Sequence, residues 1–212
     1  MYKLIDMQND PRRAQYELFC SYSNPSVGLT AKVDVTDLVR FCRERHFSFY
    51  AAMVRVVTLA ANRVPELRRR KSGDEVHEYG SCSASMTELG ENGVYYYCTL
   101  EPKQSWGEFI PYAEATRAAR RACPTLTEDA DAESQFFITS VPWVSYEQLL
   151  LPYDAAIISN PSISWGRYEA DHRDRLMLPL TLICHHGLVD GVHIGTFYRY
   201  VAEELANLPE LQ

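Results

Sequence analysis

Two adjacent histidines, His185 and His186, stand just before Asp190 in a short segment that contains two glycines. A histidine can take a proton near neutral pH, because its ordinary pKa is about 6.5. Asp190 could complete a catalytic site around such a histidine with its negative charge. Gly187 and Gly191 permit backbone geometries that other residues resist. The pattern indicates a general base held in a preformed turn. The alternative is two histidines that only close a strand, because a residue type alone marks a functional site only statistically.

The segments around this motif predict a buried strand followed by a helix. Residues 176–184 form an apolar run that is too short to span a membrane and is typical of a strand buried on both faces. After the motif, apolar residues recur every three or four positions, as on an amphipathic helix. They are Ile194, Phe197, Tyr198, Val201 and Leu205. The motif thus lies between a strand and a helix, which together give a reactive side chain a rigid frame.

The composition predicts a globular protein in which residues 1–212 form a single domain. Hydrophobic residues make up 46% and charged residues 23%, and the net charge of −7 argues against nucleic acid as the main partner. The N-terminus lacks the apolar segment of a signal peptide and no run could cross a bilayer, so we expect a cytoplasmic protein with no membrane partner. Six cysteines without a C-x-x-C pair predict reduced, mostly buried thiols.

Capping residues and composition predict four further helices. The starts are expected at Asp10-Pro11, at Thr36 and at Ser48, and an Ala- and Arg-rich composition predicts a helix over 111–122. The helix that follows Ser48 is apolar nearly all round, so we expect it to be buried against a sheet.

The strands are predicted from alternation, from turns and from short apolar runs. They are expected at 27–35, within 75–89, at 94–100 after a hairpin turn at 90–93, and at 136–144, 155–159 and 176–184. This mixture of strands and helices predicts one α/β domain, with Phe49 and Trp143 in its core.

Six stretches of the chain, in order and spacing, resemble the chloramphenicol acetyltransferase family. They are Arg12-x-x-x-Tyr16-Glu17-x-Phe19, Phe49-Tyr50-Ala51-Ala52, Pro65-Glu66-Leu67-Arg68, Pro142-Trp143-Val144, Leu178-Pro179-Leu180 and the motif that contains His185 and His186. The resemblance runs from about residue 8 to residue 206. It implies a two-layer α/β fold of a single lobe, in which helices pack against a mixed β-sheet.

The resemblance also implies an activity and the residues that perform it. Members of the family transfer an acetyl group from acetyl-coenzyme A to a hydroxyl of a small acceptor, chloramphenicol or a related compound, by direct attack. By position, His186 is the general base, His185 is structural, and Asp190 pairs with Arg12. A thioester already has a good leaving group, so a base and an oxyanion donor are sufficient chemistry. The family further implies a homotrimer with its sites between subunits.

The family's oxyanion donor is a serine, and Thr139 stands at its position in this chain. Threonine keeps the hydroxyl group, so we assign the role to Thr139, with the adjacent Ser140 as the alternative. Strand alternation turns Ser140 to the opposite face. Phe137 stands where the family has an asparagine, so the hydrogen bonding around the donor must differ.

Four more positions are assigned to substrate binding by the resemblance. Phe19 agrees with an aromatic residue of the acceptor pocket, and Ser23 replaces an apolar one. Ser164 replaces a threonine of the site, and Tyr168 falls on a tyrosine near the adenine of the coenzyme. The run Tyr95-Tyr96-Tyr97 is unusual for the family, which weakens chloramphenicol as the natural acceptor without weakening acetyl transfer.

Two other chemistries fit the residues less well. His186, Asp190 and His193 could in principle bind a metal, but the glycines and the strand-to-turn setting do not give a helical His-x-x-x-His face. Cys184 could be a nucleophile, but it lies in a run predicted to be buried and therefore inert. We expect no metal.

Other functions remain open on the same fold. An acyltransferase of the 2-oxo acid dehydrogenase type shares the His-x-x-x-Asp-Gly motif, although this chain has no room for a lipoyl domain and linker. Nonribosomal condensation domains share the double histidine but use two lobes. A non-catalytic ligand-binding module or an interaction protein is a further alternative. The retention of His186, Asp190, Arg12 and a hydroxyl at position 139 argues against it.

Overall fold

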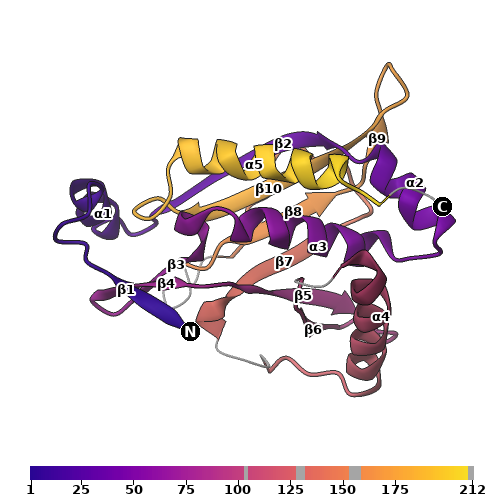
Figure 1. The fold of residues 1–212 in the computed structure, drawn as a ribbon, viewed down its shortest axis with the longest axis horizontal. Helices are drawn as coiled ribbons and strands as arrows, with labels where there is room; N and C mark the ends of the chain where they lie inside the picture. Colours follow the sequence, from indigo (N-terminus) through magenta and orange to yellow (C-terminus); the bar gives the residue numbers. More distant parts are fainter. Residues whose placement is uncertain (103–104, 128–131, 153–158, 210–212) are drawn as a thin grey trace.

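The computed structural model describes residues 1–102, 105–127, 132–152 and 159–209. These residues form an α/β structure in which helices cover one face of a mixed β-sheet, as the sequence predicts. Helices α3 (Phe49–Asn62) and α5 (Gly191–Ala206) lie side by side over that face, and α2 (Thr36–Glu44) contacts both (Figure 1). None of the helices in the described residues is long and apolar enough to cross a membrane.

The larger sheet has the strand order β2-β10-β8-β7-β5-β6, and the short strand β9 pairs with β10. The strands are β2 (Ser26–Asp34), β5 (Ser83–Leu89), β6 (Tyr95–Leu100), β7 (Gln135–Val141), β8 (Ser162–Gly166), β9 (Glu169–Ala170) and β10 (Leu176–His185). Strand β7 runs parallel to β5 and to β8, and the other pairs are antiparallel. Strand β10 thus lies between β2 and the rest of the sheet.

The remaining elements lie at the margins of this sheet. Helix α1 (Arg13–Cys20) lies at the end of the molecule where β10 leads into α5, and α4 (Trp106–Ala122) packs against β6 (Figure 1). A small antiparallel sheet has the order β1-β4-β3, from Tyr2–Ile5, Glu75–Tyr79 and Arg69–Ser72. Two short 3₁₀ helices are η1 (Pro65–Arg68) and η2 (Ala132–Ser134).

Alternation along the strands separates an apolar face from a hydroxyl-bearing face. The pairing places Met86, Ile138, Ile163 and Leu182 next to one another on four strands, and each is at most 2% exposed. Because side chains alternate, their sequence neighbours project from the opposite face. On that face a row of hydroxyl residues crosses five neighbouring strands, and this hydroxyl row consists of Thr30, Thr181, Ser164, Thr139 and Thr87.

The cap at Ser48 is confirmed, but the predicted start of α4 is wrong. The Ser48 hydroxyl accepts the N–H of Ala51 at 3.3 Å, and α3 is buried as expected. Helix α4 begins before residue 111, because Ser105 and Glu108 form a reciprocal capping box. Pro111 therefore lies inside the helix instead of starting it.

Two other helix starts are shifted because an aspartate forms a turn just before the helix. The Asp10 carboxylate accepts the N–H of Arg12 at 2.8 Å, and α1 begins only at Arg13. Likewise, the Asp34 carboxylate accepts the N–H of Thr36 at 3.0 Å, so that Thr36 is the first residue of α2 and not its cap. Aspartate favours such local turns over the helix interior.

The predicted strands at 27–35, 94–100 and 176–184 are confirmed within a residue or two, while the stretch 75–89 contains two strands, β4 and β5. Of the predicted strand 155–159, residues 155–158 lie outside the described residues. Strands β1, β3, β8 and β9 were not predicted. Trp143 is not in the core: it is 66% exposed, because β7 ends at Val141 and the chain turns away from the sheet. Phe49 is half-buried.

All six cysteines are free thiols, and four of them are buried, as expected: Cys42, Cys82, Cys98 and Cys184. Cys20 is half-buried and Cys123 is exposed. Burial raises the pKa of the Cys184 thiol well above its usual value, so this cysteine is held as an unreactive thiol.

Candidate active site

The turn between β10 and α5 is fixed by backbone hydrogen bonds. The N–H of His186 donates to the carbonyl of Pro25 at 2.7 Å, which ties the turn to the start of β2. The N–H groups of Leu188 and Val189 donate to the carbonyl of His185 at 3.0 and 3.1 Å. Asp190 is then the N-terminal cap residue of α5. The motif therefore has one geometry, set by a buried strand on one side and a helix on the other.

The imidazole of His186 is held as one tautomer. Its Nδ1 lies 3.0 Å from the carbonyl oxygen of Val189. A carbonyl can only accept, so Nδ1 carries the proton and Nε2 of the neutral ring has a free lone pair. None of the described residues forms a hydrogen bond to Nε2. The Asp190 carboxylate lies 3.3 Å from Nδ1, and the ring of Phe19 stacks on the imidazole at 3.9 Å and 15°.

Arg12 links this turn to the beginning of the chain. Its guanidinium forms an ion pair with the Asp190 carboxylate and donates to the carbonyls of His186 at 3.1 Å and Gly187 at 3.4 Å. The Arg12 side chain is only 17% exposed, and a charge that is largely removed from water requires a partner. The predicted pairing of Arg12 with Asp190 is thus present in the structure.

His185 fills a structural position beside the turn. It is 2% exposed, and its Nδ1 accepts the N–H of Gly187 at 3.1 Å. Burial lowers the pKa of His185 to about 4, so the ring is neutral near pH 7. A side chain at Gly187 would place its Cβ 2.9 Å from Cε1 of His185 and 3.4 Å from Cα of Tyr16, so only glycine fits there.

Thr139 belongs to a second cluster, on the hydroxyl row. Its Oγ1 lies 2.9 Å from Oγ1 of Thr87, and it faces Ser164 on the next strand. The Ser164 hydroxyl is fully buried and has no hydrogen-bond partner among the described residues. Thr181 follows on β10 and its Oγ1 lies 2.7 Å from that of Thr30. Thr87 was not predicted from the sequence, because only the register of β5 against β7 brings it beside Thr139.

Two adjoining hollows lie against Thr139. The larger, of about 500 Å³, is lined by Tyr50, Thr87, Glu88, Leu89, Tyr95, Tyr97, Thr139, Ser140, Pro142 and Trp143. The smaller, of about 180 Å³, is lined by Ser85, Thr87, Tyr97, Phe137, Ile138, Thr139 and Leu151. Thr139 contacts both hollows, whereas Ser140 contacts only the larger one. Tyr95 and Tyr97 of the unusual tyrosine run therefore border the space in front of Thr139.

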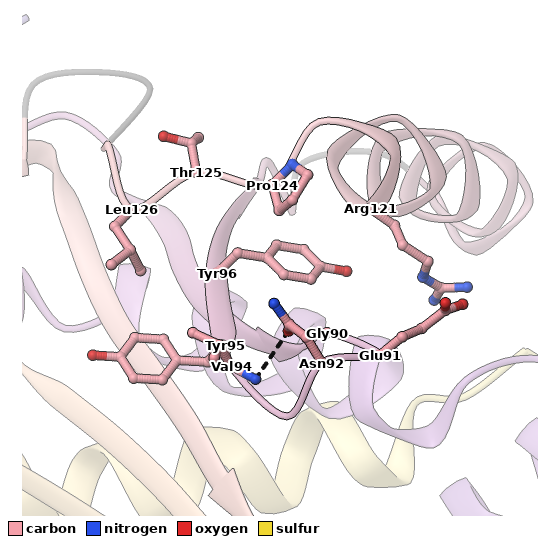
Figure 2. Close-up of a pocket in the computed structure, with 10 residues that line it drawn as sticks. All are labelled: Gly90, Glu91, Asn92, Val94, Tyr95, Tyr96, Arg121, Pro124, Thr125 and Leu126. Atoms are coloured by element: carbon pink, nitrogen blue, oxygen red, sulfur yellow. Dashed lines mark hydrogen bonds between the residues drawn. The ribbon is translucent and has the colours of Figure 1, made fainter.

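Figure 2 shows a third hollow, of about 520 Å³, at the hairpin between β5 and β6. It shares Tyr95 with the larger hollow beside Thr139. Tyr96 projects into its centre, and Glu91 and Arg121 face each other at one end (Figure 2). No predicted catalytic residue lines it, so it lies outside the candidate site.

The structure of one chain does not bring His186 and Thr139 together. Thr139 lies two strands from β10, at the level of Thr181, because Thr139 pairs with Ser164 and Ser164 with Thr181. His186 follows Thr181 by five residues. With about 3.4 Å per residue along a strand and about 4.8 Å between strands, His186 and Thr139 are roughly 20 Å apart. The side chains of His186 and Thr139 of one chain are therefore too far apart to act on the same reacting group.

Ser23 and Tyr168, which were predicted to bind substrate, lie in different parts of the chain. Ser23 is exposed in the segment between α1 and β2, next to Tyr22, whose ring packs edge-on against Phe19 at 5.4 Å. Tyr168 lies between β8 and β9, and its ring packs edge-on against Phe49 at 5.4 Å.

In the described residues, no group of three side chains could hold a metal ion.

Comparison with known proteins identifies the family. The model of the chloramphenicol acetyltransferase family matches residues 1–202. The chain belongs to the chloramphenicol acetyltransferase family. It is therefore an acetyl-CoA-dependent O-acetyltransferase. A curated member, chloramphenicol acetyltransferase 3 of Escherichia coli, is 25% identical over 211 residues, which is 97% of each chain.

Solved structures show the same fold. A chloramphenicol acetyltransferase superposes with a TM-score of 0.85 at 22% identity, over 97% of this chain and all of the other. A probable dihydrolipoamide acetyltransferase from Listeria monocytogenes superposes with a TM-score of 0.68 at 18% identity, over 92% of this chain and 89% of the other. The second likeness is one of fold alone.

Proposed function

We propose that the protein transfers the acetyl group of acetyl-CoA to a hydroxyl of a small-molecule acceptor, chloramphenicol or a related hydroxylated compound, with His186 as general base. The observation that carries this proposal is the hydrogen bond from Nδ1 of His186 to the Val189 carbonyl. It leaves the lone pair of Nε2 free to take a proton, which a general base requires.

In the proposed reaction, Nε2 of His186 takes the proton of the acceptor hydroxyl while the acceptor oxygen attacks the thioester carbonyl carbon. The carbonyl oxygen becomes an oxyanion in a tetrahedral intermediate. When the carbon–sulfur bond breaks, the oxyanion returns to a carbonyl, and the thiolate takes the proton back from His186. The products are the O-acetyl ester and free coenzyme A. The negative charge of Asp190, 3.3 Å from Nδ1, favours the imidazolium that forms in between.

We assign the oxyanion donor to Thr139. Its hydroxyl lies at the junction of the two hollows, and the partner at 2.9 Å, Thr87, can donate a proton to it. A hydroxyl that accepts from Thr87 has its own proton free for an oxyanion. Ser140 remains the alternative: the register pairs it with the buried Trp165, so it is offset from the hydroxyl row.

We further propose that the working enzyme is a homotrimer, in which His186 of one copy faces Thr139 of the next. The separation of roughly 20 Å within one chain supports this arrangement. Large apolar side chains are exposed beside both clusters, as expected for surfaces that a second copy covers. They are Leu18 and Tyr22 near Phe19, and Leu89, Tyr95 and Trp143 around the larger hollow.

The remaining assignments concern substrate binding. Phe19 already contacts His186 and would border the acceptor, with the nearby Ser23 at its edge. Ser164, which is buried and has no hydrogen-bond partner in the part of the chain that the structure describes, would provide a further hydroxyl beside Thr139. Tyr168 would lie near the adenine of acetyl-CoA.

The test measures free thiol released from acetyl-CoA with a panel of acceptors: chloramphenicol, other hydroxylated compounds, and dihydrolipoamide as a thiol acceptor. We expect release with hydroxylated acceptors, and an O-acetyl product by mass spectrometry. Release with dihydrolipoamide alone, monitored as the thioester product, would establish the 2-oxo acid type of transfer instead. No release with the panel or with a cell extract would support a binding module.

A further inference from the structure

The first turn of α5 contains a hydrogen bond that the proposed reaction does not explain. The backbone N–H of Asp190 donates to Nδ1 of His193 at 2.9 Å. The third residue of a helix often returns a side chain to the cap residue in this way, and it is usually a glutamate or glutamine. In this chain a histidine takes that place, so its Nδ1 must be unprotonated for the bond to exist.

The same peptide group also holds the general base. The peptide bond between Val189 and Asp190 has its carbonyl on Val189 and its N–H on Asp190. Its carbonyl accepts Nδ1–H of His186 at 3.0 Å, while its N–H donates to Nδ1 of His193 at 2.9 Å. A trans peptide is planar, so its N–H and C=O point in opposite directions and are fixed relative to each other. The two histidines are therefore linked by a single rigid group.

We infer that His193 is a positioning residue for the reaction, which acts on His186 through the Val189–Asp190 peptide. This inference rests on the proposed function of His186. By accepting the N–H of the peptide, His193 sets the direction of the Val189 carbonyl and polarises it as an acceptor. A better-placed acceptor favours the tautomer of His186 with its proton on Nδ1, and thus the free lone pair on Nε2.

The same contact also holds Asp190. The carboxylate of this residue pairs with Arg12 and lies 3.3 Å from Nδ1 of His186. A rotation of the Val189–Asp190 peptide would therefore move both the acceptor and the counter-charge of the base. Small displacements of this kind are costly, because catalytic groups act only within a narrow range of geometry.

The surroundings keep His193 in the required neutral form. Its Nε2 faces the carboxylate of Glu66 on η1 at 3.9 Å, which favours a proton on that side of the ring. Arg12 at the start of α1 and Arg69 on β3 also face it, and both oppose a second proton. Burial, the largest effect, lowers the pKa of His193 below its ordinary value. The ring therefore stays neutral near pH 7, with Nδ1 free to accept.

The test compares three variants of the full-length protein. His193→Ala removes the acceptor. His193→Gln keeps an acceptor, because a glutamine at this helix position can accept the cap N–H. Leu205→Ala is the control, since it removes a buried side chain at the far end of α5 and should lower the melting temperature without moving the Val189–Asp190 peptide.

We expect His193→Ala to lower kcat about tenfold, with the KM for acetyl-CoA changed less than about twofold, and His193→Gln to recover most of the loss. Leu205→Ala should keep the wild-type kcat. The inference is overturned if kcat follows the melting temperature across all three variants, or if glutamine rescues no better than alanine.

A second readout does not depend on activity. In protein labelled with ¹⁵N in histidine, the ring nitrogen shifts of His186 report its tautomer. We expect the Nδ1–H form in the wild type and in His193→Gln, and a larger share of the Nε2–H form in His193→Ala. Unchanged ring nitrogen shifts in His193→Ala would overturn the link between the two histidines. If the variants show the expected shifts but the wild-type protein is inactive with every acceptor, only the proposed function is contradicted.

Discussion

Replacement of His185 with asparagine should remove part of the acid sensitivity of the fold. The pKa of His185 is lowered to about 4 in the folded protein, by burial, while in the unfolded chain it is about 6.5. The unfolded state therefore binds a proton first as the pH falls, so His185 costs stability between pH 6.5 and 4. The full cost is about 3 kcal/mol below both pKa values, and about 2 kcal/mol has already been lost at pH 5.

Asparagine is the matched replacement, because its side-chain oxygen can accept the Gly187 N–H where Nδ1 does, yet it does not titrate. The assay is urea unfolding at pH 7.5 and pH 5.0, at one protein concentration. Other titrating groups contribute equally to both proteins and cancel in the comparison. We expect the wild type to lose about 2 kcal/mol more than His185→Asn between these pH values. An equal loss in both proteins would refute the argument that His185 is buried in its neutral form.

Four further experiments test the candidate site. His186→Ala should lower turnover by about a hundredfold or more while the far-ultraviolet circular dichroism is unchanged, and near wild-type turnover would remove His186 from the mechanism. Thr139→Val should cost roughly a hundredfold in kcat with little change in acetyl-CoA binding, while Thr139→Ser and Ser140→Ala should be mild; the reverse pattern would move the oxyanion donor to Ser140. Arg12→Ala and Asp190→Ala should each cost activity and stability, and the double variant less than their sum, because each single change strands a charge; simple additivity would mean that the two do not act as a pair. Light scattering should give the mass of three chains, and a fully active monomer would contradict the proposed trimer.

Local sequence patterns predicted the elements that hold the histidine motif. The apolar run of β10 and the helical spacing of α5 are properties of neighbouring residues, so they are visible without the fold. The start of α4 is also encoded locally, in the capping pair Ser105 and Glu108, which overrides the preference of Pro111 for the first position of a helix. Strand β8 was missed because its alternating serines, Ser162 and Ser164, resemble those of a loop, and their burial comes from strands on both sides.

The site could be predicted only as far as side-chain types reveal it. Arg12, Phe19, His186 and Asp190 do form one cluster, as the family resemblance implied. The bond from His186 to the Val189 carbonyl could not be predicted, because a backbone acceptor leaves no trace in residue identity. The distance between His186 and Thr139 depends on strand order and register, which are set by the whole sheet.

The position of β10 in the sheet has a consequence for how the chain folds. Within the described residues, strand β2, an early element of the sequence, is joined to the larger sheet only through β10, whose residues come more than 140 positions later. During synthesis, β2 and the strands β5 to β8 therefore cannot form one sheet until residue 185 has left the ribosome. Such non-local pairing slows folding and leaves strand edges exposed in the nascent chain. The pairing of β10 with β2 and β8 is thus the last step in forming the sheet. Arg12 can pair with Asp190 only after β10 is in place.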